Sequence, residues 1–97
     1  MKIIPEIKLV PHPESAEAIS ASGFKWADDR VGKRNKFGGQ PEWIQEADPQ
    51  VCSCGKEMTF YAQLDSIGDD ICIADCGMVY VFVCFDCYET KSVIQSA

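Results

Sequence analysis

Apolar and polar residues alternate most regularly between residues 58 and 65. Because successive side chains of a strand point to opposite faces, this period of two predicts a half-buried strand over 58–65. We expect its apolar residues to face the core. These residues are Met58, Phe60, Ala62 and Leu64.

Two further strands are indicated in the second half of the chain. Residues 78–83 are rich in β-branched and aromatic side chains, which is typical of a central strand covered on both faces. Residues 90–94 form a third candidate strand, and Gly68-Asp69-Asp70 marks a turn after the first. The pattern therefore predicts a three-stranded antiparallel sheet.

The first half of the chain is less regular. Alternation over 7–9 predicts a short strand that ends at Pro11-His12-Pro13, and residues 14–20 permit one or two helical turns. The charged residues 28–35 favour an exposed loop or hairpin, and Gly38-Gly39-Gln40-Pro41 is a strong turn signal.

The length of 97 residues predicts a single domain. The Asp48-Pro49 step divides it into an N-terminal strand-and-loop segment, residues 1–48, and a cysteine-bearing segment, residues 49–97. A domain this small buries only about 60–65% of its unfolded surface. Some additional staple is therefore expected.

The compartment decides how the six cysteines are interpreted. The N-terminus has a two-residue apolar run broken by Pro5 and Glu6, which is too short for a secretory signal. No apolar run reaches the 18 residues that a membrane span requires. We expect a cytoplasmic protein without membrane contact, where cysteines serve as metal ligands or remain reduced.

Four cysteines have the order of a zinc ribbon. Cys52-x-Cys54 opens the first strand of the second half, and Cys84-x-x-Cys87 joins the second strand to the third. Antiparallel pairing would bring both turns to one edge of the sheet, where four sulfurs can surround Zn²⁺ at about 2.3 Å. Gly55 favours a positive φ directly after the second ligand.

Two alternatives remain open at this point: a ligand set in which Cys72 or Cys76 replaces Cys52, and no bound metal. Four thiolates would close the coordination shell, so the zinc would be structural. The single histidine, His12, lies between two prolines and offers no partner for a catalytic triad. We therefore predict a protein that is not an enzyme and has no catalytic residues.

The formal net charge is −6, and the excess of acidic residues lies in the second half of the chain, which contains eight acidic residues and only two basic ones, Lys56 and Lys91. Such a surface attracts a basic partner protein and repels nucleic acid. A basic cluster with neighbouring aromatic residues keeps nucleic-acid binding as an alternative. It consists of Arg30, Lys33, Arg34 and Lys36.

Three short blocks resemble known families. Residues 36–45, KFGGQPEWIQ, are similar to the glycine–tryptophan motif of the YwqG-like domain family and of the C-terminal domain of the programmed cell death 2 family. Residues 58–65, MTFYAQLD, resemble the strand that follows in both. Residues 77–84, with Cys87, resemble a later segment of the programmed cell death 2 type.

The resemblance implies a β-rich fold that contains a zinc ribbon and has no established enzymatic activity. It also implies that Trp43 packs over the glycine turn and that Gln63 hydrogen-bonds to backbone. Eukaryotic members look like chaperones or adaptors that capture a client protein. Bacterial YwqG-like genes often neighbour polymorphic toxins, which implies immunity proteins.

The sequence thus predicts a mainly β single domain with a zinc ribbon of three antiparallel strands and two cysteine knuckles. We expect structural zinc on Cys52, Cys54, Cys84 and Cys87, and a zinc-stabilised, non-enzymatic protein-binding module of the adaptor or chaperone kind. The first alternative is an immunity protein that neutralises a polymorphic toxin by covering a basic surface of that toxin. The second is a nucleic-acid-binding zinc ribbon.

Overall fold

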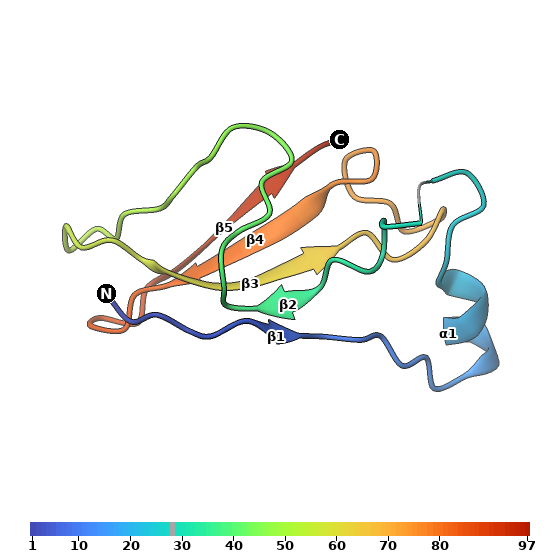
Figure 1. Cartoon of the computed structure of the whole chain (residues 1–97), viewed down its shortest axis with the longest axis horizontal. Coiled ribbons are helices and arrows are strands. Elements are labelled where there is room, and N and C mark those ends of the chain that lie inside the picture. Colours follow the sequence, from blue (N-terminus) through green and yellow to red (C-terminus); the bar gives the residue numbers. More distant parts are fainter. Residues whose placement is uncertain (28) are drawn as a thin grey trace.

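The chain forms one five-stranded antiparallel sheet whose strand order follows the sequence, β1-β2-β3-β4-β5 (Figure 1). The computed structural model describes residues 1–27 and 29–97, so Asp28, at the start of the predicted charged loop, lies outside the described residues. The mainly β prediction is confirmed. The elements are β1 (Ile7–Lys8), α1 (Ala16–Ala21), β2 (Lys36–Phe37), β3 (Thr59–Asp65), β4 (Met78–Val83) and β5 (Thr90–Gln95).

The three long strands, β3 to β5, are those that the hydrophobic pattern predicts. The sheet continues beyond them, because β2 pairs with β3 and β1 pairs with β2. The sequence indicates β1 but not β2, which has only two residues and precedes the glycine turn. Gly38 has a φ of 59°, and a Cβ there would overlap the carbonyl oxygen of Ile4. Glycine therefore lets the N-terminal segment approach the turn closely.

A β-bulge in β3 reverses the alternation that the sequence suggests. Phe60 pairs with Phe82 and Ala62 pairs with Val81, which leaves Tyr61 as an extra residue. A bulge moves every later side chain to the opposite face. Gln63 is consequently buried while Leu64 is 44% exposed, so the prediction that Leu64 faces the core is wrong.

One face of the sheet is covered by the segment that joins β2 to β3. The rings of Tyr80 and Phe82 point to this side and contact Trp43 at centroid distances of 4.7 and 6.1 Å. The Tyr80 hydroxyl donates to the carbonyl oxygen of Glu42 and accepts from the N–H of Ile44. Trp43, expected over the glycine turn, thus makes its ring contacts with the sheet.

On the other face, Ile7, Leu64 and Ile94 are exposed to solvent, and this face is called the open face below. Residues paired across the ladder share a face, so Ile7, Phe37, Ala62 and Val81 lie in one row of it. The β4 prediction is therefore half right, since Val79, Val81 and Val83 are only partly buried. The apolar residues of the open face are Ile7, Phe37, Tyr61, Ala62, Leu64, Val79, Val81, Val83 and Ile94.

A buried ion pair fixes the covered side of β3. Asp65, whose side chain is inaccessible to solvent, accepts from Arg34 Nε at 2.8 Å and Nη2 at 2.7 Å and from the backbone N–H of Gly32 at 2.7 Å. Burial raises the pKa of the Asp65 carboxyl, but these hydrogen bonds outweigh it and hold the pKa below its ordinary value. The loop before β2 is thereby tied to the sheet.

Replacing this carboxylate should be costly. We expect Asp65→Asn to lower the free energy of unfolding by about 3–5 kcal/mol, because the largely covered Arg34 guanidinium loses its counter-ion. Urea unfolding of the variant beside Asp70→Asn, which makes the same change at an exposed position, measures the effect. An equal stability of both variants would contradict it.

The pH dependence has a definite sign. Since the pKa of Asp65 is lower in the folded chain than in the unfolded one, its stabilising effect is present at neutral pH and is lost as pH falls through that lowered pKa. The stability difference between wild type and Asp65→Asn should shrink accordingly in acid.

Candidate metal centre

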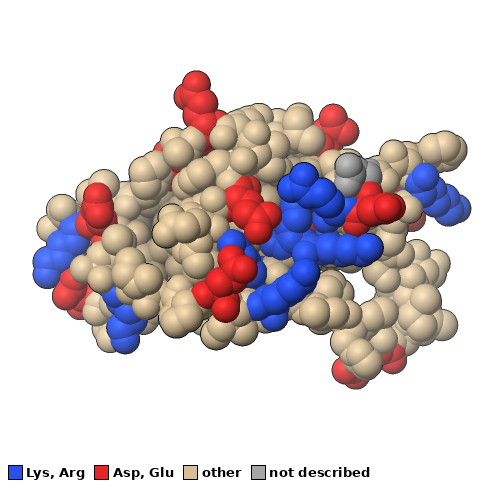
Figure 2. All heavy atoms as spheres, in the orientation of Figure 1, with Lys and Arg blue, Asp and Glu red and all other residues tan. Residues whose placement is uncertain are grey.

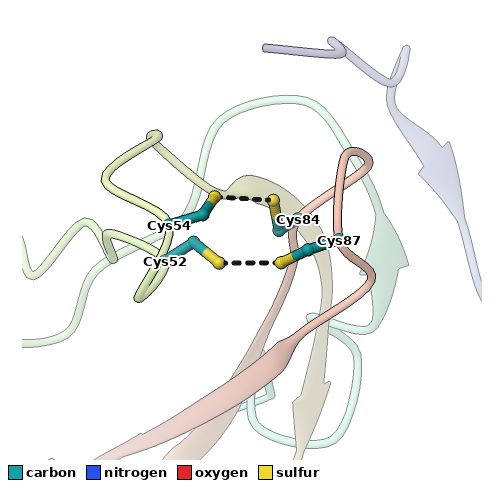
Figure 3. Close-up of side chains that lie close together, drawn as sticks. All are labelled: Cys52, Cys54, Cys84 and Cys87. Carbon is teal, nitrogen blue, oxygen red and sulfur yellow. Dashed lines mark hydrogen bonds between the residues drawn. The ribbon is translucent and has the colours of Figure 1, made fainter.

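The first cysteine pair lies on a tight hairpin that leads into β3. The backbone N–H of Cys52 donates to the carbonyl oxygen of Lys56, and the N–H of Gly55 donates to the carbonyl oxygen of Cys52, both at 2.8 Å. Gly55 has a φ of 90°, which confirms the expected left-handed residue after Cys54. Figure 3 shows the side chains of Cys52 and Cys54 pointing toward Cys87 and Cys84.

The second pair lies on a similar hairpin between β4 and β5. The N–H of Cys84 donates to the backbone carbonyl oxygen of Glu89 at 2.9 Å, and the N–H of Tyr88 donates to the backbone carbonyl oxygen of Cys84 at 2.8 Å. Tyr88 follows Cys87 as Gly55 follows Cys54, and it too has a positive φ, 61°. A non-glycine residue in this region costs about 1–2 kcal/mol, and no local sequence signal announces it.

Pairing of β3 with β4 brings the two hairpins together. Thr59 pairs with Val83, so the cysteines before β3 and after β4 meet at one end of the sheet. Figure 3 shows the sulfurs facing one another: Cys52 Sγ lies 3.1 Å from Cys87 Sγ, and Cys54 Sγ lies 3.8 Å from Cys84 Sγ. All four sulfurs lie within 4.8 Å of one another and could hold a metal ion.

One of these two sulfur–sulfur distances equals that of a tetrahedral thiolate site, and the other is shorter. Four sulfurs at 2.3 Å from a central ion are separated by about 3.8 Å, which the Cys54–Cys84 pair matches and the Cys52–Cys87 pair undercuts. Cys52 and Cys84 are buried against the core, whereas Cys54 and Cys87 are exposed. A metal held here would join the core to the solvent-facing side of both hairpins.

The thiols of the group differ in acidity. The backbone N–H groups of Cys87 and Asp86 favour a thiolate at Cys84 and lower its pKa to about 7. The hydrogen bond with Cys52 raises the pKa of Cys87 to about 12. Because metals bind cysteine as thiolate, binding to this group must release protons.

A contact that the sequence does not announce bridges the two hairpins. Glu89 accepts from the hydroxyl of Ser53 at 2.6 Å and from its backbone N–H at 3.2 Å. The Ser53 hydrogen bonds lower the pKa of the Glu89 carboxyl. Ser53 is the residue between Cys52 and Cys54, so Glu89 holds the short Cys-x-Cys turn against the second hairpin.

The remaining cysteines lie elsewhere. Cys72 and Cys76 belong to the β3–β4 connection, at the end of the ladder opposite the four-sulfur group, with their own sulfurs 3.5 Å apart. Among the described residues, the four-cysteine group is the one set of three or more metal-ligand side chains gathered closely enough for one ion.

The basic cluster is partly neutralised. Figure 2 shows basic side chains gathered on one face next to acidic ones. Arg34 is engaged by Asp65, and the buried Lys36 donates to Glu6 at 2.6 Å and to the carbonyl oxygen of Gln40 at 2.7 Å. Two of the four predicted cations thus hold the fold together.

Gln63 fulfils the role that the family resemblance implies. Its Oε1 accepts from the N–H of Glu42 at 3.0 Å, and its Nε2 donates to the carbonyl oxygen of Arg34 at 2.7 Å. Both partners belong to the segments on either side of β2, so the side chain fixes that turn from within the sheet.

Within the described residues, no helix is long and apolar enough to cross a membrane.

No family model and no solved structure matches the chain. A curated relative, the "Uncharacterized protein YpfL" of Salmonella typhimurium, is 36% identical over 64 residues. The aligned part is 63% of this chain and 15% of the relative. The chain is thus similar to a small portion of a much longer protein, whose name states no activity.

The Glu89 bridge should tighten metal binding. We expect Glu89→Ala to weaken affinity for Zn²⁺ by about tenfold, the lower end of outer-shell effects, because the Cys52–Cys54 turn loses its link to the second hairpin. Competition with a chromophoric chelator measures the affinity. Glu57→Ala removes the same charge from the first hairpin and should bind Zn²⁺ like wild type. An equal loss of affinity in both variants would show that net charge, and not the bridge, causes the effect.

Proposed function

We propose that Cys52, Cys54, Cys84 and Cys87 bind one structural zinc ion and that the stapled domain is a non-enzymatic protein-binding module. Four cysteine ligands in a tetrahedral arrangement favour zinc or iron among biological metals, and zinc forms closed structural sites of this kind. The two hairpins with β3, β4 and β5 would then constitute the zinc ribbon. A closed shell leaves no coordination position for a substrate or water.

The open face of the sheet carries the binding proposal. Ile7 is 54%, Leu64 44% and Ile94 57% exposed, and Tyr61 packs edge-on against Phe37 beside them. The polar residues that pair with its apolar residues in the same rows, Thr59, Thr90 and Ser92, are uncharged. Contiguous exposed apolar surface of this kind marks protein–protein interaction sites.

Charge specifies the partner further. The net charge of −6, together with the charge of about −2 that four thiolates around a dication would add, gives the domain an overall negative potential. The partner that fits is a protein with an apolar contact surface bordered by Lys or Arg. The pairing of Arg34 and Lys36 with carboxylates supports this proposal over nucleic-acid binding.

Membership of the YwqG-like or programmed cell death 2 group remains a proposal. The Gly38 turn and the Gln63 hydrogen bonds support it. Under that proposal, either a client protein or a basic toxin would be the partner, and either one would bind the open face.

Metal content tests the structural half of the proposal. Elemental mass spectrometry should find one zinc per chain in wild type and in Cys72→Ser, and none that survives dialysis in Cys84→Ser, because three thiolates hold zinc far more weakly. Thiol titration should show four additional reactive thiols after chelation. Stoichiometric zinc in Cys52→Ser would refute the ligand set, and iron in place of zinc would refute the metal.

Matched substitutions test the binding half. Leu64→Asp places a charge on the open face, whereas Ile19→Asp makes a similar change on α1, where Ile19 is 62% exposed. A partner captured by wild type, purified and titrated should bind Leu64→Asp at least about tenfold more weakly and Ile19→Asp normally. Its affinity should also fall with salt.

Several outcomes would count against this surface. Equal binding by both variants would place the contact elsewhere. Concentration-dependent dimerisation in sedimentation, abolished by Leu64→Asp, would show that a second copy occupies the face. Thermal melts of both variants establish that each remains folded.

A further inference from the structure

The β3–β4 connection contains a second pair of sulfurs that the metal site does not use. Cys72 Sγ lies 3.5 Å from Cys76 Sγ, at the end of the sheet remote from the four-cysteine group (Figure 1). Within the described residues no further Cys, His, Asp or Glu joins this pair to make a group of three ligands around one point. The pair is therefore better suited to sulfur chemistry than to holding an ion.

The backbone around the pair is unusual. Ala74, Asp75 and Cys76 have consecutive φ values of 46, 57 and 64°, a left-handed turn made without glycine. Each such residue costs about 1–2 kcal/mol, so surrounding contacts must enforce the conformation. Strain of this kind at a fixed pair of side chains is typical of a functional site.

Buried contacts supply that enforcement. The Ser66 hydroxyl accepts from the N–H of Ile73 at 3.0 Å and donates to the carbonyl oxygen of Gly77 at 2.8 Å. Arg34, already fixed by Asp65, donates to the carbonyl oxygen of Cys76 at 3.0 Å. The left-handed turn is thus held in place by hydrogen bonds at Ile73, Cys76 and Gly77.

The same turn points the two thiols at each other. The backbone N–H of Cys76 donates to Cys72 Sγ at 2.8 Å, which holds the Cys72 sulfur next to Cys76. The contact with Cys72, followed by burial, raises the pKa of the Cys76 thiol. To form a disulfide, the two sulfurs must approach from 3.5 Å to about 2.05 Å.

Small molecules can reach the pair. Both cysteines are partly exposed and line a surface hollow of about 410 Å³ together with Trp26, Asp69 and Asp75. Trp26 is fully open to solvent in this hollow, with 89% of its surface exposed. The two sulfurs therefore lie at the surface, where reactive cysteines are found, and not in the core.

We propose that Cys72 and Cys76 are a reversible thiol–disulfide redox pair that exchanges with low-molecular-weight disulfides. One cysteine thiolate attacks a sulfur of the small disulfide, forms a mixed disulfide and releases one small thiolate. The second cysteine, as its thiolate, then attacks the protein sulfur of the mixed disulfide, forms the Cys72–Cys76 bond and releases the second small thiolate. The chain loses two protons and two electrons, and the small disulfide is reduced to two thiols.

The test exposes the full chain, with whatever metal it carries after purification, to glutathione disulfide, followed by alkylation, intact mass and peptide mapping. Wild type should lose the mass of two hydrogens, with the bond mapped to Cys72 and Cys76, and should recover them with dithiothreitol. Metal content measured in parallel should stay constant, so the result is independent of the proposed zinc site.

Single-cysteine variants provide the matched control. Cys72→Ser and Cys76→Ser should each retain one glutathione on the remaining cysteine, because the resolving thiol is absent. In wild type the mixed disulfide should be at least about tenfold less abundant than in these variants. Stable glutathione on both cysteines of wild type, two free thiols, or bonds confined to Cys52, Cys54, Cys84 and Cys87 would each overturn the proposal.

Discussion

The antiparallel ladder between β3 and β4 is the interaction on which the rest of the molecule depends. At one end it holds the two cysteine hairpins together through the pairing of Thr59 with Val83. At the other end it sets the start and finish of the loop that contains Cys72 and Cys76. The bulge at Tyr61, between these ends, decides which side chains each face receives.

Polar residues inside the sheet compensate for the small amount of regular structure. Gln63, Asp65 and Gln95 are buried on the covered side, and each binds backbone of an irregular segment rather than another strand. Within the described residues, no buried side-chain nitrogen or oxygen lacks a hydrogen-bond partner. Because unsatisfied buried groups are expensive, these side chains fix long loops in one conformation that apolar contacts alone would not specify.

The two sulfur sites differ because their surroundings differ. The four-cysteine group forms where two hairpins from distant parts of the chain converge, so its geometry links β3 to β4 and β5. The Cys72–Cys76 pair is made by one loop whose left-handed turn is enforced by Ser66 and Arg34. Convergence of four sulfurs suits a metal, whereas two sulfurs at one exposed turn suit exchange chemistry.

The sequence by itself predicted the three long strands, permitted one or two helical turns within residues 14–20, and favoured the four cysteines that the fold brings together. These follow from local signals: side-chain period, β-propensity, and short cysteine spacing at strand ends. Tertiary structure alone decided the bulge at Tyr61, the two-residue β2, the position of Trp43 on Tyr80 and the Glu89–Ser53 bridge. Each of these depends on a partner more than 15 residues away, so no window of neighbouring residues contains the contact that makes it favourable.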